Sequence, residues 1–152
     1  MIENKRFVSF LVILVILLLD QFSKWYVKVS NILPIYFNNN VGFSLPIAWY
    51  IPWIGIVGVV TYLFFKKKNL YSFVPKSNSS RLEMLLYVAI SFIVAGGIGN
   101  VIDRIIYNGS VIDFIDLKFW PIFNIADISI VIGALMFVLY YYKVSKLIQI
   151  KD

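Results

Sequence analysis

The sequence predicts an all-α membrane protein with four transmembrane helices, cytoplasmic N- and C-termini and a small extracytoplasmic β-containing cradle. The first observation is composition: 61% of the 152 residues are hydrophobic and 14% are charged, too apolar for one small soluble core. The second is a set of long apolar segments, and the third is a one-sided distribution of Lys and Arg. Since no linker or repeat divides the chain, residues 1–152 are expected to form a single integral-membrane domain.

Four apolar segments approach the roughly 20 helical residues that cross a hydrocarbon core. They are Phe7–Val27, Leu45–Phe65, Met84–Ile102 and Ile125–Tyr142. The first has a second interpretation, because Lys5 and Arg6 precede its apolar stretch as they would in a signal peptide. No small-x-small cleavage site follows, so a retained helix is preferred.

The basic residues predict the orientation of the helices. With four crossings, ten of the 14 Lys and Arg residues fall on the side of the termini, and four fall on the other. That bias places both termini in the cytoplasm. The net charge of +6 is explained by this topology and by contact with anionic membrane lipid, so no nucleic-acid partner is expected.

Two outer segments are predicted to supply the β structure. The loop Ile32–Pro46 carries aromatic and β-branched residues before an Asn/Gly turn. If residues 108–124, NGSVIDFIDLKFWPIFN, are extended, Asp113 falls on one face with Val111, Ile115 and Leu117, and Asp116 falls on the other face with Ile112, Phe114 and Lys118. Irregular backbone at membrane depth must be buried in protein or line a cavity, so a cradle resting on the membrane is expected to bring Asp113 beside Asp127.

Five of the eight acidic residues share the outer side in this topology: Asp20, Asp103, Asp113, Asp116 and Asp127. Carboxylates in or near a membrane are costly and mark candidate functional sites. Asp127 has a simpler interpretation, since it lies three residues after Asn124, and the two residues can cap the last helix.

The neighbouring polar residues also have simpler interpretations. Asp20 and Lys24, four residues apart, can form an interfacial ion pair. Asp103 and Arg104 can pair as they end a helix. The small residues of AGGIGN, residues 95–100, can let another helix approach closely, although helix packing leaves Asn100 unexplained.

The chain contains no Cys and no His, which excludes a Cys nucleophile, a Ser-His dyad and the usual zinc ligands. Two carboxylates held close together share a proton, so one can take a proton from water while the other protonates the peptide carbonyl or the leaving amine. Metal binding is a competing use of clustered acids, but without His it is disfavoured, and no metal or other cofactor is expected.

Two other functions are compatible with acids in a membrane protein. A small proton-coupled transporter subunit would use Asp20, Asp103 and Asp127 as a relay, and a non-catalytic membrane scaffold would use none of them. A relay must connect both sides of the membrane, whereas these acids stop at the outer side. A peptidase is therefore the preferred interpretation.

Four motifs occur in the order and spacing of one known family. They are DQFSK (Asp20–Lys24), NNNVGFS (Asn38–Ser44), GGIGNVIDR (Gly96–Arg104) and VIDF with FNIAD (Val111–Phe114 and Phe123–Asp127). Over nearly its whole length the chain resembles bacterial lipoprotein signal peptidase, signal peptidase II. The resemblance implies an aspartic endopeptidase that crosses the bacterial plasma (inner) membrane several times, with its active site toward the extracytoplasmic leaflet. Its substrate would be a diacylglyceryl-modified prolipoprotein, cut before the lipid-modified cysteine. Separately, a monomer is expected.

The resemblance also implies the site residues. Asp113 and Asp127 match the catalytic pair. The substrate-binding or supporting residues would be Asp20, Lys24, Asn40, Gly42, Asn100, Asp103, Arg104 and Asn124.

One motif departs from the family pattern, which usually has two more residues between Asn-x-Gly and Phe-Ser. Here Asn40-Val41-Gly42 continues directly into Phe43-Ser44. The shape of this loop, and which of its asparagines faces substrate, are therefore open.

Overall fold

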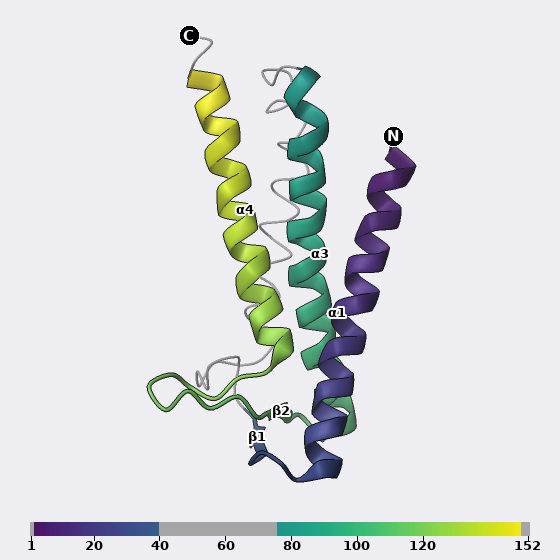
Figure 1. The fold of residues 1–152 in the computed structure, drawn as a ribbon, viewed down its shortest axis with the longest axis vertical. Helices are drawn as coiled ribbons and strands as arrows, with labels where there is room; N and C mark the ends of the chain where they lie inside the picture. The colour runs from purple at the N-terminus through teal and green to yellow at the C-terminus, as the bar shows by residue number, and fades with distance from the viewer. Residues whose placement is uncertain (1, 40–75, 150–152) are drawn as a thin grey trace.

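The computed structural model describes residues 2–39 and 76–149, which form three long helices and a two-stranded sheet (Figure 1). In chain order the elements are α1 (Ile2–Ser30), β1 (Tyr36–Asn38), α3 (Lys76–Ile106), β2 (Val111–Asp113) and α4 (Ile125–Gln149). The predicted helix Leu45–Phe65 lies outside the described residues, as do Asn40 and Gly42.

Each described helix is long and apolar enough to cross a membrane. The helices contain the predicted spans Phe7–Val27, Met84–Ile102 and Ile125–Tyr142, so these three predictions are confirmed. Phe10 and Leu18 on α1 are 61% and 60% exposed, whereas Asp20 on the same helix is 0% exposed. Apolar side chains outside and charged side chains inside reverse the usual pattern of a soluble protein and fit a protein embedded in lipid.

Left-handed residues end two of the helices. Asn31 follows α1 with a φ of 52°, and its N–H donates to the Val27 carbonyl at 3.1 Å. After α3, Asn108 and Gly109 have φ values of 51° and 94°, and the Gly109 N–H returns to the Arg104 carbonyl at 2.8 Å. Asn and Gly adopt this conformation most readily, so the turns stop each helix and direct the chain into a strand.

Helix α3 packs against both α1 and α4. A Cβ added at Gly96 would lie 2.3 Å from the Ala126 carbonyl oxygen, and one at Gly133 would lie 2.7 Å from that of Ala89. Since a side chain would overlap backbone at both positions, glycine permits the close approach of α3 and α4. The predicted packing role of the GGIGN segment is confirmed at Gly96.

Strands β1 and β2 pair antiparallel, with Tyr36 opposite Asp113 and Asn38 opposite Val111. The prediction that the two outer segments supply matching strands is therefore confirmed. All three residues of β2 are buried, because both of its faces are covered. Ile112 packs with Val27 in an apolar cluster, while Asp113 receives polar side chains.

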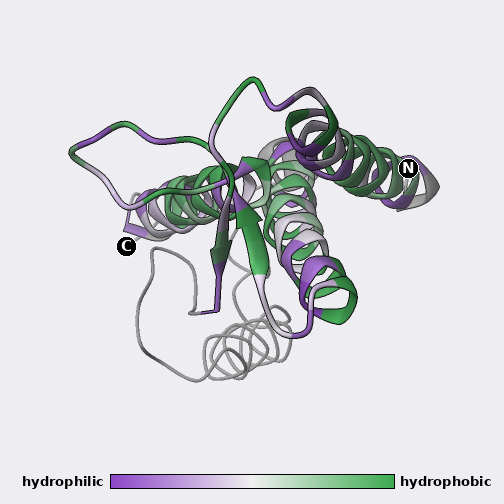
Figure 2. Ribbon diagram, turned by 90° about the horizontal axis from the view of Figure 1, so that it is seen from below, coloured by the Kyte–Doolittle hydropathy of each residue, from purple (hydrophilic) through white to green (hydrophobic). Residues whose placement is uncertain are grey.

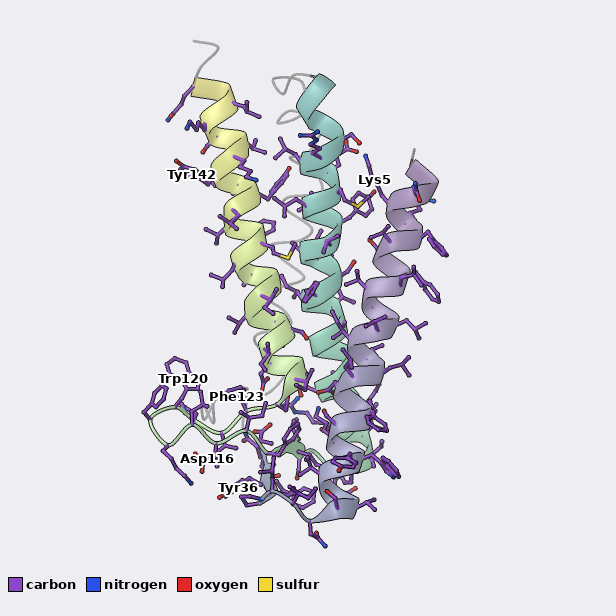
Figure 3. All side chains as sticks on the ribbon, in the orientation of Figure 1. Lys5, Tyr36, Asp116, Trp120, Phe123 and Tyr142 are labelled. Atoms are coloured by element: carbon purple, nitrogen blue, oxygen red, sulfur yellow. The ribbon has the colours of Figure 1, made fainter. Side chains whose placement is uncertain are left out.

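The helices lie side by side, with α1 and α3 running in one direction and α4 in the other (Figure 1). The chain termini lie at one end and the two strands at the opposite end, which is viewed end-on in Figure 2. Lys5 lies toward the end with the termini and pairs there with Glu83, while Asp116 and Trp120 lie on the loop projecting from the strand end (Figure 3). The polar residues described next gather at the strand end.

Candidate active site

A buried polar cluster joins the helices to β2 at the strand end. Every member is at most 6% exposed. The members are Asp20, Lys24, Asn100, Asp103, Asp113, Asn124 and Asp127. The structure thus brings together seven of the predicted site residues from four separate elements.

Asp127 and Asn124 form a reciprocal cap at the start of α4. The Asp127 N–H donates to Asn124 Oδ1 at 3.0 Å, and the Asn124 N–H donates to Asp127 Oδ2 at 3.3 Å. This is the capping-box arrangement, so the capping interpretation of Asp127 is confirmed. The cap uses only one carboxylate oxygen, which leaves Oδ1 directed into the cluster.

Amide side chains connect Asp127 to Asp113. Asn100 Nδ2 donates to Asp127 Oδ1 at 2.9 Å, and Asn124 Nδ2 donates to Asp113 Oδ1 at 2.7 Å. The two amides meet where Asn124 Nδ2 donates to Asn100 Oδ1 at 3.1 Å. Asp113 and Asp127 therefore belong to one continuous hydrogen-bonded network and face a common set of donors.

Asp113 lies on β2, and its carboxyl group has a raised pKa. Burial raises the pKa of its carboxyl from 3.8 to about 6, and the charge of Asp127 acts in the same direction. Hydrogen bonds from Asn38 and Asn124 and the charge of Lys24 oppose that rise in pKa. The effect of Asp127 on this pKa indicates that the two carboxylates interact, so their ionisations are coupled.

Lys24 lies between two further acids. Its Nζ is 2.8 Å from Asp20 Oδ2 and 2.9 Å from Asp103 Oδ2. The predicted Asp20–Lys24 pair forms, it is buried within the protein, and it also includes Asp103. Asp103 and Arg104 are successive residues on a helix and diverge in direction, which lets Asp103 reach Lys24 while Arg104 Nη1 donates to the Asn100 carbonyl at 3.2 Å.

Gly99 makes room for this arrangement. A Cβ at position 99 would lie 2.6 Å from Asp20 Oδ2. The small-residue segment therefore serves two purposes, since Gly96 admits α4 and Gly99 admits the carboxylate of Asp20.

Asp116 lies apart from the cluster. Its carboxylate accepts hydrogen bonds from Lys118 Nζ at 2.7 Å and from the Lys118 N–H at 2.8 Å, and these bonds lower the pKa of Asp116. The predicted separation of Asp113 from Asp116 is confirmed in position.

Two polar residues that donate to the cluster were not among the predicted site residues. Asn38 Nδ2 donates to Asp113 Oδ2 at 2.8 Å, and Gln21 Nε2 donates to Asp20 Oδ2 at 3.0 Å and to Asp103 Oδ1 at 3.1 Å. Both residues occur inside quoted motifs, NNNVGFS and DQFSK. The register of β1 against β2, which brings the Asn38 side chain to Asp113, was the missing information.

Among residues 2–39 and 76–149, no group of three or more acids is arranged to hold a metal ion. These side chains can share one proton between the carboxyl groups of Asp113 and Asp127, while amide donors hold both groups in place. That is an arrangement for acid–base chemistry on a bound carbonyl.

The fold and the cluster together define a membrane-embedded protein with a carboxylate site at one end of its helices. Residues 12–143 match the family described as signal peptidase (SPase) II, and the chain belongs to that family. It is therefore a peptidase of the aspartic class, and family membership gives no support to the transporter or scaffold alternatives.

Named relatives agree with this assignment. The lipoprotein signal peptidase of Polynucleobacter necessarius is 33% identical over 82% of this chain and 83% of its own. That of Halothermothrix orenii is 32% identical over 90% of this chain and 97% of its own. A solved structure described as a bacterial membrane enzyme has a TM-score of 0.61 at 27% identity, covering 90% of this chain and 88% of its own.

Proposed function

We propose that this chain removes the signal peptide from diacylglyceryl-modified prolipoproteins, using Asp113 and Asp127 to activate water. The observation that carries the proposal is the amide bridge from Asp113 through Asn124 and Asn100 to Asp127. It holds two coupled carboxylates in a buried site of a chain whose relatives are named lipoprotein signal peptidases.

The two aspartates have different roles in this proposal. Asp127 lies in the first turn of α4, where the N–H of Asn124 and the helix dipole favour a carboxylate. Asp113 lies on a strand, and burial keeps its carboxyl protonated up to about pH 6. Asp127 is therefore the base, and Asp113 holds the proton.

Cleavage then proceeds in two stages, each with two proton transfers. Asp127 takes a proton from water as the water oxygen attacks the scissile carbonyl, and Asp113 gives its proton to the carbonyl oxygen. As the tetrahedral intermediate collapses, the C–N bond breaks and the leaving amine receives a proton from Asp127. The new carboxyl group returns a proton to Asp113, so the dyad ends as it began.

The position of the site suits a substrate that spans the membrane. The carboxylates gather at one end of the apolar helices. A signal peptide lying along these helices would therefore bring the peptide bond at its C-terminal end to the carboxylates. The exposed apolar surface beside the site can accept the acyl chains of the modified cysteine.

The topology in the proposal has four crossings, with both termini in the cytoplasm and the site toward the extracytoplasmic leaflet of the bacterial plasma membrane. The parallel direction of α1 and α3 supports a further crossing between them. The concentration of Lys and Arg near the chain termini supports this orientation. The active unit is a monomer, since this chain itself supplies both aspartates.

The test uses purified protein with two precursor peptides that differ only in the diacylglyceryl group on cysteine. We expect cleavage before the cysteine of the lipidated peptide and none of its unmodified twin. Equal cleavage of both peptides would contradict the proposed substrate class, and cleavage of neither would contradict the function.

A further inference from the structure

Two backbone amides next to the proposed dyad donate to acids outside it. The Ile112 N–H, one residue before Asp113, donates to Asp103 Oδ2 at 3.0 Å. The Ala126 N–H, one residue before Asp127, donates to Asp20 Oδ1 at 2.9 Å. The two chain segments that carry the dyad are thus fixed in the same manner, each by a buried carboxylate on a helix.

The two supporting acids are joined to each other through α1. Lys24 Nζ contacts Asp20 Oδ2 at 2.8 Å and Asp103 Oδ2 at 2.9 Å. Gln21 Nε2 contacts Asp20 Oδ2 at 3.0 Å and Asp103 Oδ1 at 3.1 Å. Gln21 and Lys24 are three residues apart, so they lie on the same face of the helix.

Because Asp20, Lys24 and Asp103 are buried, the link between the two acids depends on the charge of Lys24. Asp20 is 0% exposed, Asp103 1% and Lys24 3%, so the two carboxylates repel one another with little screening unless the ammonium lies between them. The conformation of either carboxylate also fixes a backbone amide beside the dyad. Any separation of Asp20 from Asp103 would therefore pull the backbone at Ala126 away from the backbone at Ile112.

We propose that Lys24 and Gln21 are positioning residues that set the spacing of the two catalytic aspartates. They act chiefly through Asp20 and Asp103, which hold the backbone at Ala126 and Ile112. Lys24 Nζ also donates to Asn100 Oδ1 at 3.3 Å, and its charge acts on Asp113. Lys24 makes the stronger link between Asp20 and Asp103 because its ammonium is charged, and Gln21 makes a weaker link through neutral hydrogen-bond donors. The inference rests on the proposed roles of Asp113 and Asp127.

Lys24→Met tests the inference, because it keeps the length of the side chain and removes the ammonium. The matched control is Lys28→Met, one turn further along α1, where the Lys28 ammonium lies 4.6 Å from the centre of the Tyr107 ring and outside the cluster. Two readouts are measured: amide hydrogen exchange of segments 111–114 and 124–128, and separate kcat and KM for the lipidated precursor.

In Lys24→Met we expect faster exchange in both segments and a fall in kcat of about 100-fold, with KM little changed, because misplacement of reacting groups by about 1 Å has effects of this size. Lys28→Met is expected to match the parent in both readouts. Gln21→Leu is expected to show a smaller fall in kcat, again without a rise in KM.

A double variant distinguishes positioning from a general packing role. Lys24→Met with Asp103→Asn removes the cation and one of the two repelling charges, and the new amide can still accept from the Ile112 N–H. We expect the double variant to recover part of the kcat lost in Lys24→Met. A packing role predicts instead that the two losses add.

Unchanged exchange in both segments in Lys24→Met would overturn the inference, as would a loss confined to KM or additive losses in the double variant. The exchange readout does not depend on activity. If the parent cleaves no lipidated precursor, the proposed function fails, while the exchange result still decides whether Lys24 holds both segments.

Discussion

At the scale of single residues, Asp113 links the structure of the site to its pH dependence. Burial and the charge of Asp127 raise the pKa of its carboxyl to about 6, so it is protonated below that pH and ionised above it. The proposed mechanism needs that proton. We therefore expect kcat/KM to fall on the alkaline side with an apparent pKa of about 6.

A change at Asn38 should shift the alkaline limb of the kcat/KM profile. Its amide stabilises the ionised form of Asp113, so Asn38→Ala should raise the pKa of Asp113 and shift the alkaline limb of the kcat/KM profile to higher pH. Asn39→Ala is the control, because the side chain of Asn39 accepts from Ser110. A limb that stays in place or moves to lower pH in Asn38→Ala would contradict the role given to Asp113.

Asp127 shows what a sequence can and cannot predict for one residue. Its spacing from Asn124 predicted the cap, which is present, but the cap occupies only one carboxylate oxygen. The contact of the other oxygen with Asn100 joins residues 27 positions apart, and local periodicity contains no information about it. Gln21 was overlooked for the same reason, since its partner Asp103 is 82 positions away.

At the scale of elements, hydropathy was sufficient to predict the three described helices, and the extended sequence pattern was only partly sufficient to predict the strands. An apolar run of sufficient length has few alternatives in lipid, so α1, α3 and α4 contain their predicted spans. The extended pattern of residues 111–118 predicted that Asp113 and Asp116 lie on opposite faces. It did not predict that both faces are buried, because that depends on the residues of other elements that cover them.

Gly96 is the element-scale test. In Gly96→Ala the added methyl group would lie 2.3 Å from the Ala126 carbonyl oxygen, which is backbone and cannot move aside as a side chain can. We expect α3 and α4 to separate and the free energy of unfolding to fall by about 1–3 kcal/mol. Thermal unfolding in detergent measures the change.

Val29→Ile adds a methylene at a side chain that is 63% exposed on α1, and it should leave the unfolding temperature near that of the parent. If Gly96→Ala unfolds at the same temperature as Val29→Ile, the close approach of α3 and α4 does not depend on glycine.

At the scale of the whole molecule, the proposed topology places the carboxylate cluster on the extracytoplasmic side. The sequence contains no cysteine, so a single introduced thiol reports one position without interference. Phe119→Cys lies on the projecting loop, where the side chain is 83% exposed, and Ser79→Cys lies near the start of α3. In right-side-out vesicles, an impermeant thiol reagent should label the first variant and should label the second only after permeabilisation.

Labelling of both variants from one side would contradict the orientation and the clustering of acids inferred from it. The matched control for reagent access is the same pair of variants in detergent, where both thiols should react.

The central claim is that Asp113 and Asp127 act as one catalytic unit, and kcat of four purified variants on the lipidated precursor tests it most directly. Asn has nearly the size of Asp but cannot exchange a proton in this role. We expect Asp113→Asn and Asp127→Asn each to lose nearly all turnover while still binding precursor, and the double variant to be scarcely slower than either, because the two residues act together.

Asp116→Asn supplies the matched comparison, because Asp116 pairs with Lys118 on the projecting loop, and its turnover should be of the same order as that of the parent. Since Asn also caps helices well, an Asp127 that served only as a cap would tolerate the change. Asp127→Asn or Asp113→Asn enzyme with near-parental turnover would therefore contradict the account, as would loss of turnover in Asp116→Asn alone.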